Sequence, residues 1–407
     1  MRIAFLNTYG NGSTGKIVDS LKSFALKNGF EVLSFFSREY CATPGTSKRF
    51  FTKSGFYFDA LMTRLFDNHG LNNKANNKRI IKNLKMFKPD IVHIHNLHGY
   101  WINYKLLFNF LKESNIKVVF TLHDCWPFTG HCTHFDYVKC EKWKTKCNKC
   151  PQKKSYPRSL FFDKSAKNFL LKKKAFTQLA KDQMTISVPS SWLKDIVSLS
   201  FLKEYNCLVI NNGIDTDVFK PTNSSLRNKY GIGNKTLVLA VANYWDERKG
   251  LRYVFDCARK KPNWIFVYVG HIKNNSNQFL PNVIHIERTE SQSELAAWYT
   301  TANVFLNPTL EDNYPTTNLE AYACHTPIVT FNTGGSPELI IKTGCGLVSA
   351  EKTTEALIES IEMCLAKKQL PRFDYEIVSK NSMLNSYLNL YNRMMGLPEE
   401  RQVYNEN

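Results

Sequence analysis

Short apolar runs alternate with amphipathic segments along the first half of the chain. Residues 2–9 and 30–36 have the composition of buried strands, and residues 15–29 between them place apolar side chains at helical spacing. The same strand, helix, strand order returns between residues 90 and 124. Strands that alternate with helices in this way predict a parallel sheet with helices on both faces.

The alternation stops in a stretch rich in turn-forming residues, 208–221, and restarts over residues 236–270. We therefore predict an α/β fold of two Rossmann-like domains, residues 1–203 and 204–375, that face each other across a cleft. Residues 376–407 are predicted to form helices that pack back toward the first domain. In doubly wound sheets, ligands bind outside the carboxyl ends of the strands. A functional site is therefore expected in the cleft.

The length of the chain and the lengths of its apolar segments limit the classes of protein that fit. A chain of 407 residues is long for one hydrophobic core, which agrees with two domains. No apolar run approaches the roughly 18 residues that a transmembrane helix needs. The apolar start, residues 3–6, is too short for the core of a secretory signal. We therefore expect a cytoplasmic protein.

The formal net charge of +19 indicates an anionic partner or, alternatively, a lysine-rich solvated surface. Residues 163–182 surround a possible apolar helix face with lysines, a pattern typical of helices that lie on anionic lipid. Residues 55–67 are apolar and aromatic, and they fit lipid contact and a buried core helix equally well. We predict peripheral contact with the anionic inner face of the cell membrane.

Cysteines crowd into a predicted insertion of the first domain at about residues 125–151. In a cytoplasmic chain, thiols are read as metal ligands before disulfides, and Cys147 and Cys150 have the spacing of a zinc knuckle. We predict a structural zinc ion. Exchange of one ligand for His131 or His134, disulfides and free thiols stay open as alternatives. The four predicted ligands are Cys132, Cys140, Cys147 and Cys150.

A glycine-rich loop lies between the first predicted strand and helix. Residues 10–16 fit the G-x-x-x-x-G-K part of a nucleotide-binding P-loop, but the next residue is Ile17, where a P-loop needs a hydroxyl for magnesium. Gly12 and Gly15 would let a phosphate or sugar approach the backbone and the helix N-terminus closely. We interpret the loop as a contact for phosphate or sugar, with a purely structural turn as the alternative.

Residues 307–340 carry the acids most suited to a binding site. Glu311 and Asp312 follow a predicted strand, and Glu320 lies in the next helix. A carboxylate aimed into a cleft can accept hydrogen bonds from neighbouring sugar hydroxyls, and the amides of residues 313–317 could meet phosphate oxygens. The alternative is that these are solvated surface acids.

His93 and His95 share one face of a predicted strand, and His98 follows it. Three interpretations stay open for them: structural hydrogen bonding, contact with an acceptor or nucleotide, and a catalytic metal. No carboxylate follows closely, which weighs against the metal.

Several of these motifs together resemble the retaining family-four glycosyltransferases, which have the two-Rossmann GT-B fold. They are "NNGIDTDVFKP", "RKGL", "EAYACHTPIV", "GGSPE", the glycine loop, "PDIVHIHNLHG" and "TLHD". The likeness covers nearly the whole chain. "HNLHGYWIN" and "TLHDCWPFTGHC" are similar to the branch that builds bacterial capsular, exopolysaccharide and O-antigen repeat units.

The resemblance implies a role for individual residues of this chain. Glu320 would bind the nucleotide ribose, and the acid eight positions earlier would face the donor sugar. That acid is Asp312 where the family usually has Glu, and Glu311 beside it is an alternative. Lys249 would hold the diphosphate. Family members often have Arg six positions before this Lys, and this chain has Asn243, so Arg248 is expected to supply the charge.

The resemblance also divides the site residues into three sets. The catalytic set is His123, Asp312, Glu311 and Lys249. The donor-binding set is Gly12, Arg248, Lys249, Asn313, Tyr314, Pro315, Thr316, Thr317 and Glu320. The acceptor-side set is His95, Asp124 and Trp126.

The predicted function is a glycosyltransferase that retains anomeric configuration. It would move a sugar from a UDP- or GDP-sugar to a lipid-linked or oligosaccharide acceptor, with no catalytic metal and no nucleic-acid partner. Two alternatives stay open: a basic zinc-containing nucleic-acid-binding protein, and a homologue that binds sugar nucleotides but no longer turns over.

Overall fold

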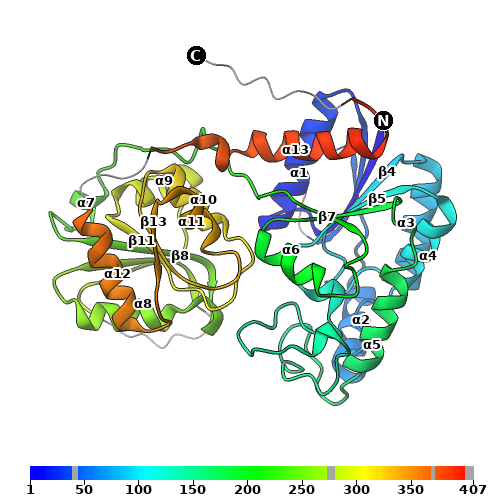
Figure 1. The fold of residues 1–407 in the computed structure, drawn as a ribbon, viewed down its shortest axis with the longest axis horizontal. Helices are drawn as coiled ribbons and strands as arrows, with labels where there is room; N and C mark the ends of the chain where they lie inside the picture. The colour runs from blue at the N-terminus through cyan, green and yellow to red at the C-terminus, as the bar shows by residue number, and fades with distance from the viewer. Residues whose placement is uncertain (39–44, 273–279, 368–371, 399–407) are drawn as a thin grey trace. The chain divides into compact units, whose positions relative to one another are not determined.

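A computed structural model describes residues 1–38, 45–272, 280–367 and 372–398 (Figure 1). The chain divides into two compact units. Unit 1 comprises Met1–Ile210 and the C-terminal segment from Leu384, and unit 2 comprises Asn211–Met383.

Unit 1 is built on a parallel sheet with the strand order β3-β2-β1-β4-β5-β6-β7. All residues of the inner strands β4 and β6 are buried, including the polar residues His93, Thr185 and Ser187. The strands are β1 (Arg2–Tyr9), β2 (Glu31–Arg38), β3 (Ser47–Arg49), β4 (Ile91–Ile94), β5 (Lys117–Thr121), β6 (Met184–Val188) and β7 (Asn206–Val209).

The helices of unit 1 cover this sheet. The segment between η1 and α5 forms a lobe with little regular structure. The side chains of Asn103 and Ser190 cap two of the helices by accepting hydrogen bonds from first-turn amides. The helices are α1 (Gly12–Lys27), α2 (Lys53–Phe66), α3 (Lys74–Phe87), α4 (Tyr104–Ser114), α5 (Ser165–Phe176), α6 (Ser191–Ser198) and, from Leu384 onward, α13 (Lys380–Met394), with short 3₁₀ helices η1 (Trp126–Phe128) and η2 (Lys142–Lys144).

Unit 2 is built on a second parallel sheet, with the order β10-β9-β8-β11-β12-β13. Its strands are β8 (Leu237–Trp245), β9 (Ile265–Ile272), β10 (Val283–Ile286), β11 (Val304–Asn307), β12 (Ile328–Phe331) and β13 (Gly346–Ser349). Its helices are α7 (Leu226–Lys229), α8 (Leu251–Lys260), α9 (Gln292–Thr301), α10 (Thr316–Ala323), α11 (Glu338–Thr343) and α12 (Thr354–Ala366), with 3₁₀ helices η3 (Glu247–Lys249) and η4 (Tyr375–Ile377).

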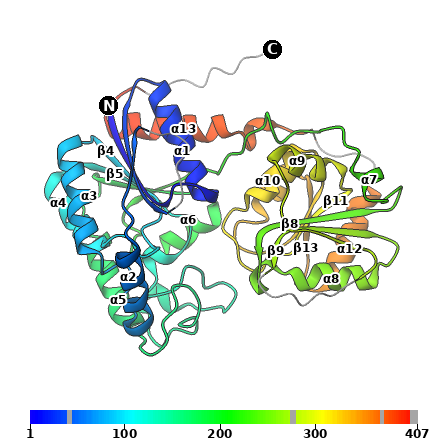
Figure 2. The same cartoon turned by 180° about the vertical axis from the view of Figure 1, so that it is seen from behind.

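Both faces of the sheet of unit 2 are buried. Leu237 and Leu239 on β8 belong to the core that includes α9 and α10, whereas Val238 and Ala240 belong to the core under α8 and α12. Figure 2 shows these two helix pairs on opposite sides of the sheet. Because successive side chains of a strand point to opposite faces, a strand covered on both sides must be apolar throughout.

The predicted lipid-binding role of residues 163–182 is wrong. The helix there is α5, and Phe169 and Phe176 on its apolar side are buried in the core of unit 1. Lys172, predicted to flank a lipid-facing surface, is itself buried. Among the described residues, no helix is both long enough and apolar enough to cross a membrane.

The helix predicted over residues 55–67 is α2, and it matches neither interpretation in full. Its buried residues are Asp59, Ala60 and Thr63, and Asp59 accepts a hydrogen bond from Asn72 at 2.7 Å. Its outward face is apolar instead. That face, the exposed face of α2, comprises Tyr57, Phe58 and Leu61, which are 67%, 56% and 53% exposed.

Candidate active site

Two segments that follow neighbouring strands of unit 2 bring a lysine and an acid together. Lys249 ends η3, shortly after β8, and Asp312 lies in the loop that follows β11. The Lys249 ammonium donates a hydrogen bond to Asp312 Oδ2 at 2.6 Å, although the residues are 63 positions apart. This pair lies beyond the carboxyl ends of parallel strands, where ligands bind in this class of fold.

The backbone around Lys249 holds its position closely. Gly250 has φ of +74°, and a Cβ there would meet the carbonyl oxygen of Pro308 at 2.1 Å, so only glycine fits. The amide of Leu310 donates to the carbonyl of Arg248 at 2.6 Å. Asp246 caps η3 by accepting from the Lys249 amide at 3.1 Å. The lysine is therefore on a rigid turn.

Arg248 and the two neighbouring acids differ in accessibility. The Arg248 guanidinium pairs with Asp246 at 2.9 Å and lies 3.7 Å from Glu311. The Glu311 side chain is 2% exposed, whereas that of Asp312 is 16% exposed. Asp312 is thus the acid that a ligand can reach more easily.

Glu320 lies in α10, the helix that follows the loop carrying Asp312. Pro315 precedes the first turn of α10, and Thr316 and Thr317 in that turn are partly exposed, whereas Asn313 and Tyr314 are buried. Glu320 follows one turn later and accepts a hydrogen bond from the Tyr299 hydroxyl at 2.9 Å.

The "GGSPE" motif packs directly on the loop that carries Glu311 and Asp312. Gly334 has φ of +55°, and a Cβ there would lie 1.8 Å from the carbonyl oxygen of Asp312. Close approach of two backbones therefore explains this glycine. Ser336 accepts a hydrogen bond from Asn318 at 2.9 Å through its carbonyl oxygen, which ties the motif to α10.

The glycine loop of unit 1 lies between β1 and α1, as predicted. Gly12 begins α1 with φ of +74° and is exposed. Gly15 is buried, and a Cβ there would meet the Gly10 backbone at 2.9 Å. Ile17 is buried in the core, which accounts for an apolar residue after the lysine.

Histidines of unit 1 form a buried, hydrogen-bonded group. His95 Nδ1 lies 2.9 Å from His123 Nε2, and burial lowers the pKa of His123 to about 4. His93 bonds the hydroxyls of Tyr391 and Thr121, each at 2.7 Å, and burial lowers its pKa as well. Structural hydrogen bonding therefore accounts for His93, whereas His95 and His123 pair with each other.

Asp124 adjoins this group and is held as a carboxylate. Burial alone would raise its pKa, but the charge of His98 and its hydrogen bond at 2.8 Å more than offset this, and the pKa falls to about 2. Asp124 also accepts from the Trp126 amide at 2.9 Å. The Trp126 ring is 1% exposed, so it has no free face for stacking on a sugar.

The structure thus brings the predicted site residues together in two sets. Lys249, Arg248 and the two acids form one set in unit 2, with Glu320 on the helix that follows. His95, His123 and Asp124 form the other set in unit 1. The sequence analysis missed Tyr299, which holds Glu320, because an aromatic residue on a buried helix face carries no functional signal.

The cysteine-rich insertion at about residues 125–151, the cysteine lobe, has four thiols around one small cavity. Cys132, Cys140, Cys147 and Cys150 all line it. The thiols of Cys132 and Cys150 are hydrogen-bonded to each other, which lowers the pKa of Cys150 to about 7. In the part of the chain that the structure describes, no three His, Cys, Asp or Glu side chains are already arranged to hold a metal ion. The predicted zinc ion is therefore not shown.

Two family models match this chain. The model described as "Glycosyltransferase Family 4" matches residues 15–218, half of the chain, and the model described as "Glycosyl transferases group 1" matches residues 235–367. The chain belongs to glycosyltransferase family 4, as its motifs indicated, and is therefore a glycosyltransferase.

Individual proteins agree with this assignment. The chain is 26% identical over 324 residues to the putative colanic acid biosynthesis glycosyl transferase WcaC of Escherichia coli K12, with 75% of this chain and 77% of that protein covered. Sucrose-phosphate synthase from Thermosynechococcus elongatus has a TM-score of 0.70 at 16% identity, covering 97% of this chain and 99% of that one. Anabaena HepE in complex with UDP and glucose has a TM-score of 0.65 at 13% identity, covering 97% and 100%. These structures confirm the predicted α/β fold with two parallel sheets.

Proposed function

We propose that this glycosyltransferase moves a sugar from a UDP- or GDP-sugar to a lipid-linked or oligosaccharide acceptor in the synthesis of a bacterial surface polysaccharide, with retention of anomeric configuration. The observation that carries the proposal is the Lys249–Asp312 pair at 2.6 Å beyond the carboxyl ends of β8 and β11. A fixed cation beside a partly exposed carboxylate supports the proposal, because a nucleotide sugar would need both groups. Unit 2 would bind the donor and unit 1 the acceptor.

Each donor-side residue has a role in this proposal. Lys249 and Arg248 would hold the diphosphate, and Asp312 would accept hydrogen bonds from the donor sugar, because it is more accessible than Glu311. The first-turn amides of α10 would meet phosphate oxygens. Glu320, oriented by Tyr299, would accept hydrogen bonds from the ribose hydroxyls.

The proposed chemistry follows from where charge develops. Breaking the bond between sugar and diphosphate leaves negative charge on the departing phosphate. Fixed cations and amides that are already oriented stabilise that charge without reorganisation. We propose that no metal ion takes part in this step. The acceptor hydroxyl would attack from the face that the phosphate leaves, and a phosphate oxygen would take its proton.

The comparisons support two finer parts of the proposal. WcaC is described as a colanic acid biosynthesis enzyme, which favours a surface polysaccharide as the product here. The HepE structure holds UDP and glucose, which makes UDP the first nucleotide to test here. On the acceptor side we place His123 and Asp124, with the buried His95 as the hydrogen-bond partner that positions His123. The neutral imidazole of His123 suits hydrogen bonding with an uncharged sugar hydroxyl.

A thermal-shift screen against UDP, GDP and ATP tests the donor assignment. We expect UDP or GDP to raise the melting temperature of the wild type without added magnesium. Glu320→Gln should lose most of this shift, because an amide accepts fewer hydrogen bonds than a carboxylate. Tyr299→Phe is the matched control, since it removes the hydrogen bond to Glu320 but keeps the carboxylate, and it should retain most of the shift. Stabilisation by ATP alone would overturn the proposal.

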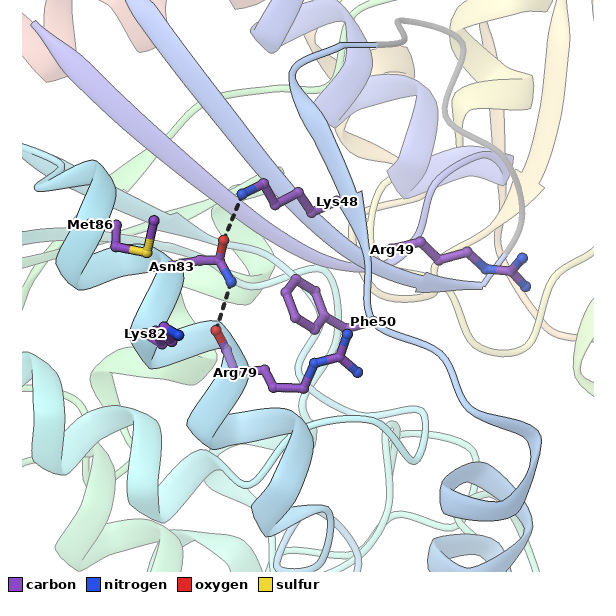
Figure 3. A pocket seen from close by; sticks show the side chains of 7 residues that line it. All are labelled: Lys48, Arg49, Phe50, Arg79, Lys82, Asn83 and Met86. Atoms are coloured by element: carbon purple, nitrogen blue, oxygen red, sulfur yellow. Dashed lines mark hydrogen bonds between the residues drawn. The ribbon is translucent and has the colours of Figure 1, made fainter.

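We further propose that unit 1 rests on the cytoplasmic face of an anionic membrane. The exposed face of α2 supplies an apolar surface of two aromatic rings and a leucine. Near the start of this helix, β3 and α3 form the basic pocket shown in Figure 3, in which Lys48 donates to Asn83 at 2.6 Å. Among its described lining residues none is acidic. They are Lys48, Arg49, Phe50, Arg79, Lys82, Asn83 and Met86.

Vesicle co-sedimentation tests this membrane contact. We expect the combined variant Tyr57→Ser, Phe58→Ser and Leu61→Ser to bind phosphatidylglycerol-containing vesicles at least about tenfold more weakly, because buried apolar side chains supply most of the affinity. Ile341→Ser with Met363→Ser is the control, since these unit 2 residues are 75% and 53% exposed. Equal binding of both variants and the wild type would refute the assignment of this surface.

The cysteine lobe is part of the same proposal as a structural zinc site. The lobe has little regular structure, and a metal ion commonly stabilises small lobes of this kind alongside buried aromatic side chains such as Phe135 and Trp143. The cavity lined by its four cysteines supports this assignment.

A further inference from the structure

The contact with Asp67 engages Nδ1 of His131 and leaves Nε2 as the ring nitrogen without a hydrogen-bond partner among the described residues. Its side chain is fully buried, and Nδ1 lies 2.7 Å from Asp67 Oδ1. The other carboxylate oxygen of Asp67 accepts the Lys164 amide at 2.7 Å. An ionised carboxylate only accepts hydrogen bonds, so Nδ1 of His131 must carry the proton. The opposite nitrogen, Nε2, is then an acceptor in the neutral ring.

This nitrogen has nothing to accept from. Among the described residues, Nε2 of His131 is buried and has no hydrogen-bond partner. A buried polar atom without a partner destabilises the fold, so it needs an explanation. His131 also lines the cavity of the cysteine lobe. A lone pair at a cavity lined by thiols has the chemistry of a metal ligand.

We propose that His131 Nε2 is the fourth ligand of a structural zinc ion, together with the thiolates of Cys132, Cys147 and Cys150. This inference rests on the zinc site proposed above and changes its ligand set. Asp67 would be the carboxylate that orients the ligating histidine, an arrangement that metal-binding histidines commonly share. Cys140 is the residue excluded.

The contacts of the three thiols favour this set. Cys132 and Cys150 already touch through a hydrogen bond. Cys147 accepts the Gly130 amide at 3.2 Å and is three positions before Cys150. Cys140 and Cys150 are both only partly buried, and the hydrogen bond with Cys132 is what favours Cys150 as the ligand. Binding of a zinc ion would require the side chains to close onto it and would release the thiol protons.

A buried lysine lies beside the proposed site. Three thiolates, a neutral imidazole and Zn²⁺ carry one net negative charge. Lys172 interacts electrostatically with Cys132 and Cys147, and burial lowers its pKa to about 7. Lys172 donates to the Trp126 carbonyl at 2.7 Å, so the zinc site would be linked to the segment that carries Asp124.

X-ray absorption on the zinc-loaded, reduced wild type tests the ligand set without any variant. We expect one zinc ion per chain, with three sulfur neighbours at about 2.3 Å and one nitrogen at about 2.0–2.1 Å. A shell of four sulfurs would overturn the role of His131 but keep the zinc site. A chain that holds no zinc, or that forms a Cys132–Cys150 disulfide under the same conditions, would overturn both. Neither outcome depends on transferase activity.

Variants separate the candidate ligands. We expect His131→Gln to lower zinc affinity at least about tenfold in a chelator competition, and Asp67→Asn to lower it about 10–100-fold. Cys140→Ser should keep wild-type affinity, as should the control Cys207→Ser, which removes a thiol outside the lobe. His131→Cys should restore binding and strengthen the sulfur-to-cobalt charge-transfer band of the Co²⁺ form. Loss of zinc in Cys140→Ser with unchanged affinity in His131→Gln would refute the proposal.

Discussion

We expect Lys249→Ala to lower kcat/KM for the proposed sugar transfer by about 10²–10³-fold, or about 3–4 kcal/mol of transition-state stabilisation. The reason is that Lys249 ends a rigid turn, with Gly250 against the Pro308 carbonyl and Asp246 capping the turn. A cation held in place before the reaction stabilises the charge that appears on the leaving phosphate. Because this interaction strengthens as charge develops, the loss should fall mainly on kcat.

A matched ion pair elsewhere in unit 2 controls for general effects. Lys260 pairs with Glu355 at 2.6 Å, the same distance as Lys249 to Asp312, but the pair is exposed on α8 and α12. Lys260→Ala should leave kcat/KM unchanged and alter the melting temperature little, because exposed ion pairs contribute little. Lys249→Arg keeps the charge and should recover part of the activity. A Lys249→Ala enzyme with more than a tenth of wild-type kcat/KM on a verified donor would refute the role in diphosphate binding.

The two sheets could be predicted because their strands obey a local rule. Strands that are covered on both faces, such as β11, read as short apolar runs, and the helices between them show helical spacing. The parallel order then follows from the alternation itself. The two-domain organisation came from the turn-rich stretch 208–221, and the chain divides between Ile210 and Asn211.

The surroundings of the two amphipathic segments could not be predicted from periodicity, because a helical pattern does not say what each face meets. On α5 the apolar face meets the core, and the buried Lys172 reaches the Trp126 carbonyl and lies 3.7 Å from the centre of its ring. On α2 the pattern is inverted, since Asp59 is inside and bonded to Asn72, whereas Phe58 is outside. Partners distant in sequence satisfy these buried charges.

The candidate site was predictable only where motifs carry it. Lys249 and Asp312 were found through their motifs, and their contact across 63 positions agrees with the expected neighbourhood. The Asp67 partner of His131 lies 64 positions away and in no motif, so nothing in the sequence indicated which nitrogen of His131 is bare. The exposure of the two acid side chains, which distinguishes Asp312 from Glu311, could not be predicted from the sequence either.

We expect unit 1 to lose stability steeply between pH 6.5 and 5, before unit 2 does. Burial lowers the pKa of four histidines in unit 1 from the ordinary value of 6.5, that of His123 to about 4. Below pH 6.5 the unfolded chain binds protons that the folded unit cannot, so stability falls as the pH falls. The four are His69, His93, His95 and His123.

One buried acid opposes this trend. Burial raises the pKa of Asp59 from 3.8 to about 6, so the folded unit gains a proton there as the pH falls through that range. Four lowered histidine pKa values outweigh this one raised carboxyl pKa, so near pH 5 the unfolded chain binds more protons than the folded unit. Each proton of difference corresponds to a slope of about 1.4 kcal/mol per pH unit.

Urea unfolding at pH 7, 6 and 5, followed by hydrogen exchange of peptides from each unit, measures the effect. His95→Gln should reduce the slope for unit 1 by about 1.4 kcal/mol per pH unit, because one titrating group is removed. His271→Gln is the control, since this histidine belongs to unit 2 and its side chain is 35% exposed. Equal acid sensitivity of both units, or a slope that His95→Gln leaves unchanged, would mean that the histidine group is not the cause. Groups other than these histidines would then have to bind the protons that unfolding takes up in this range.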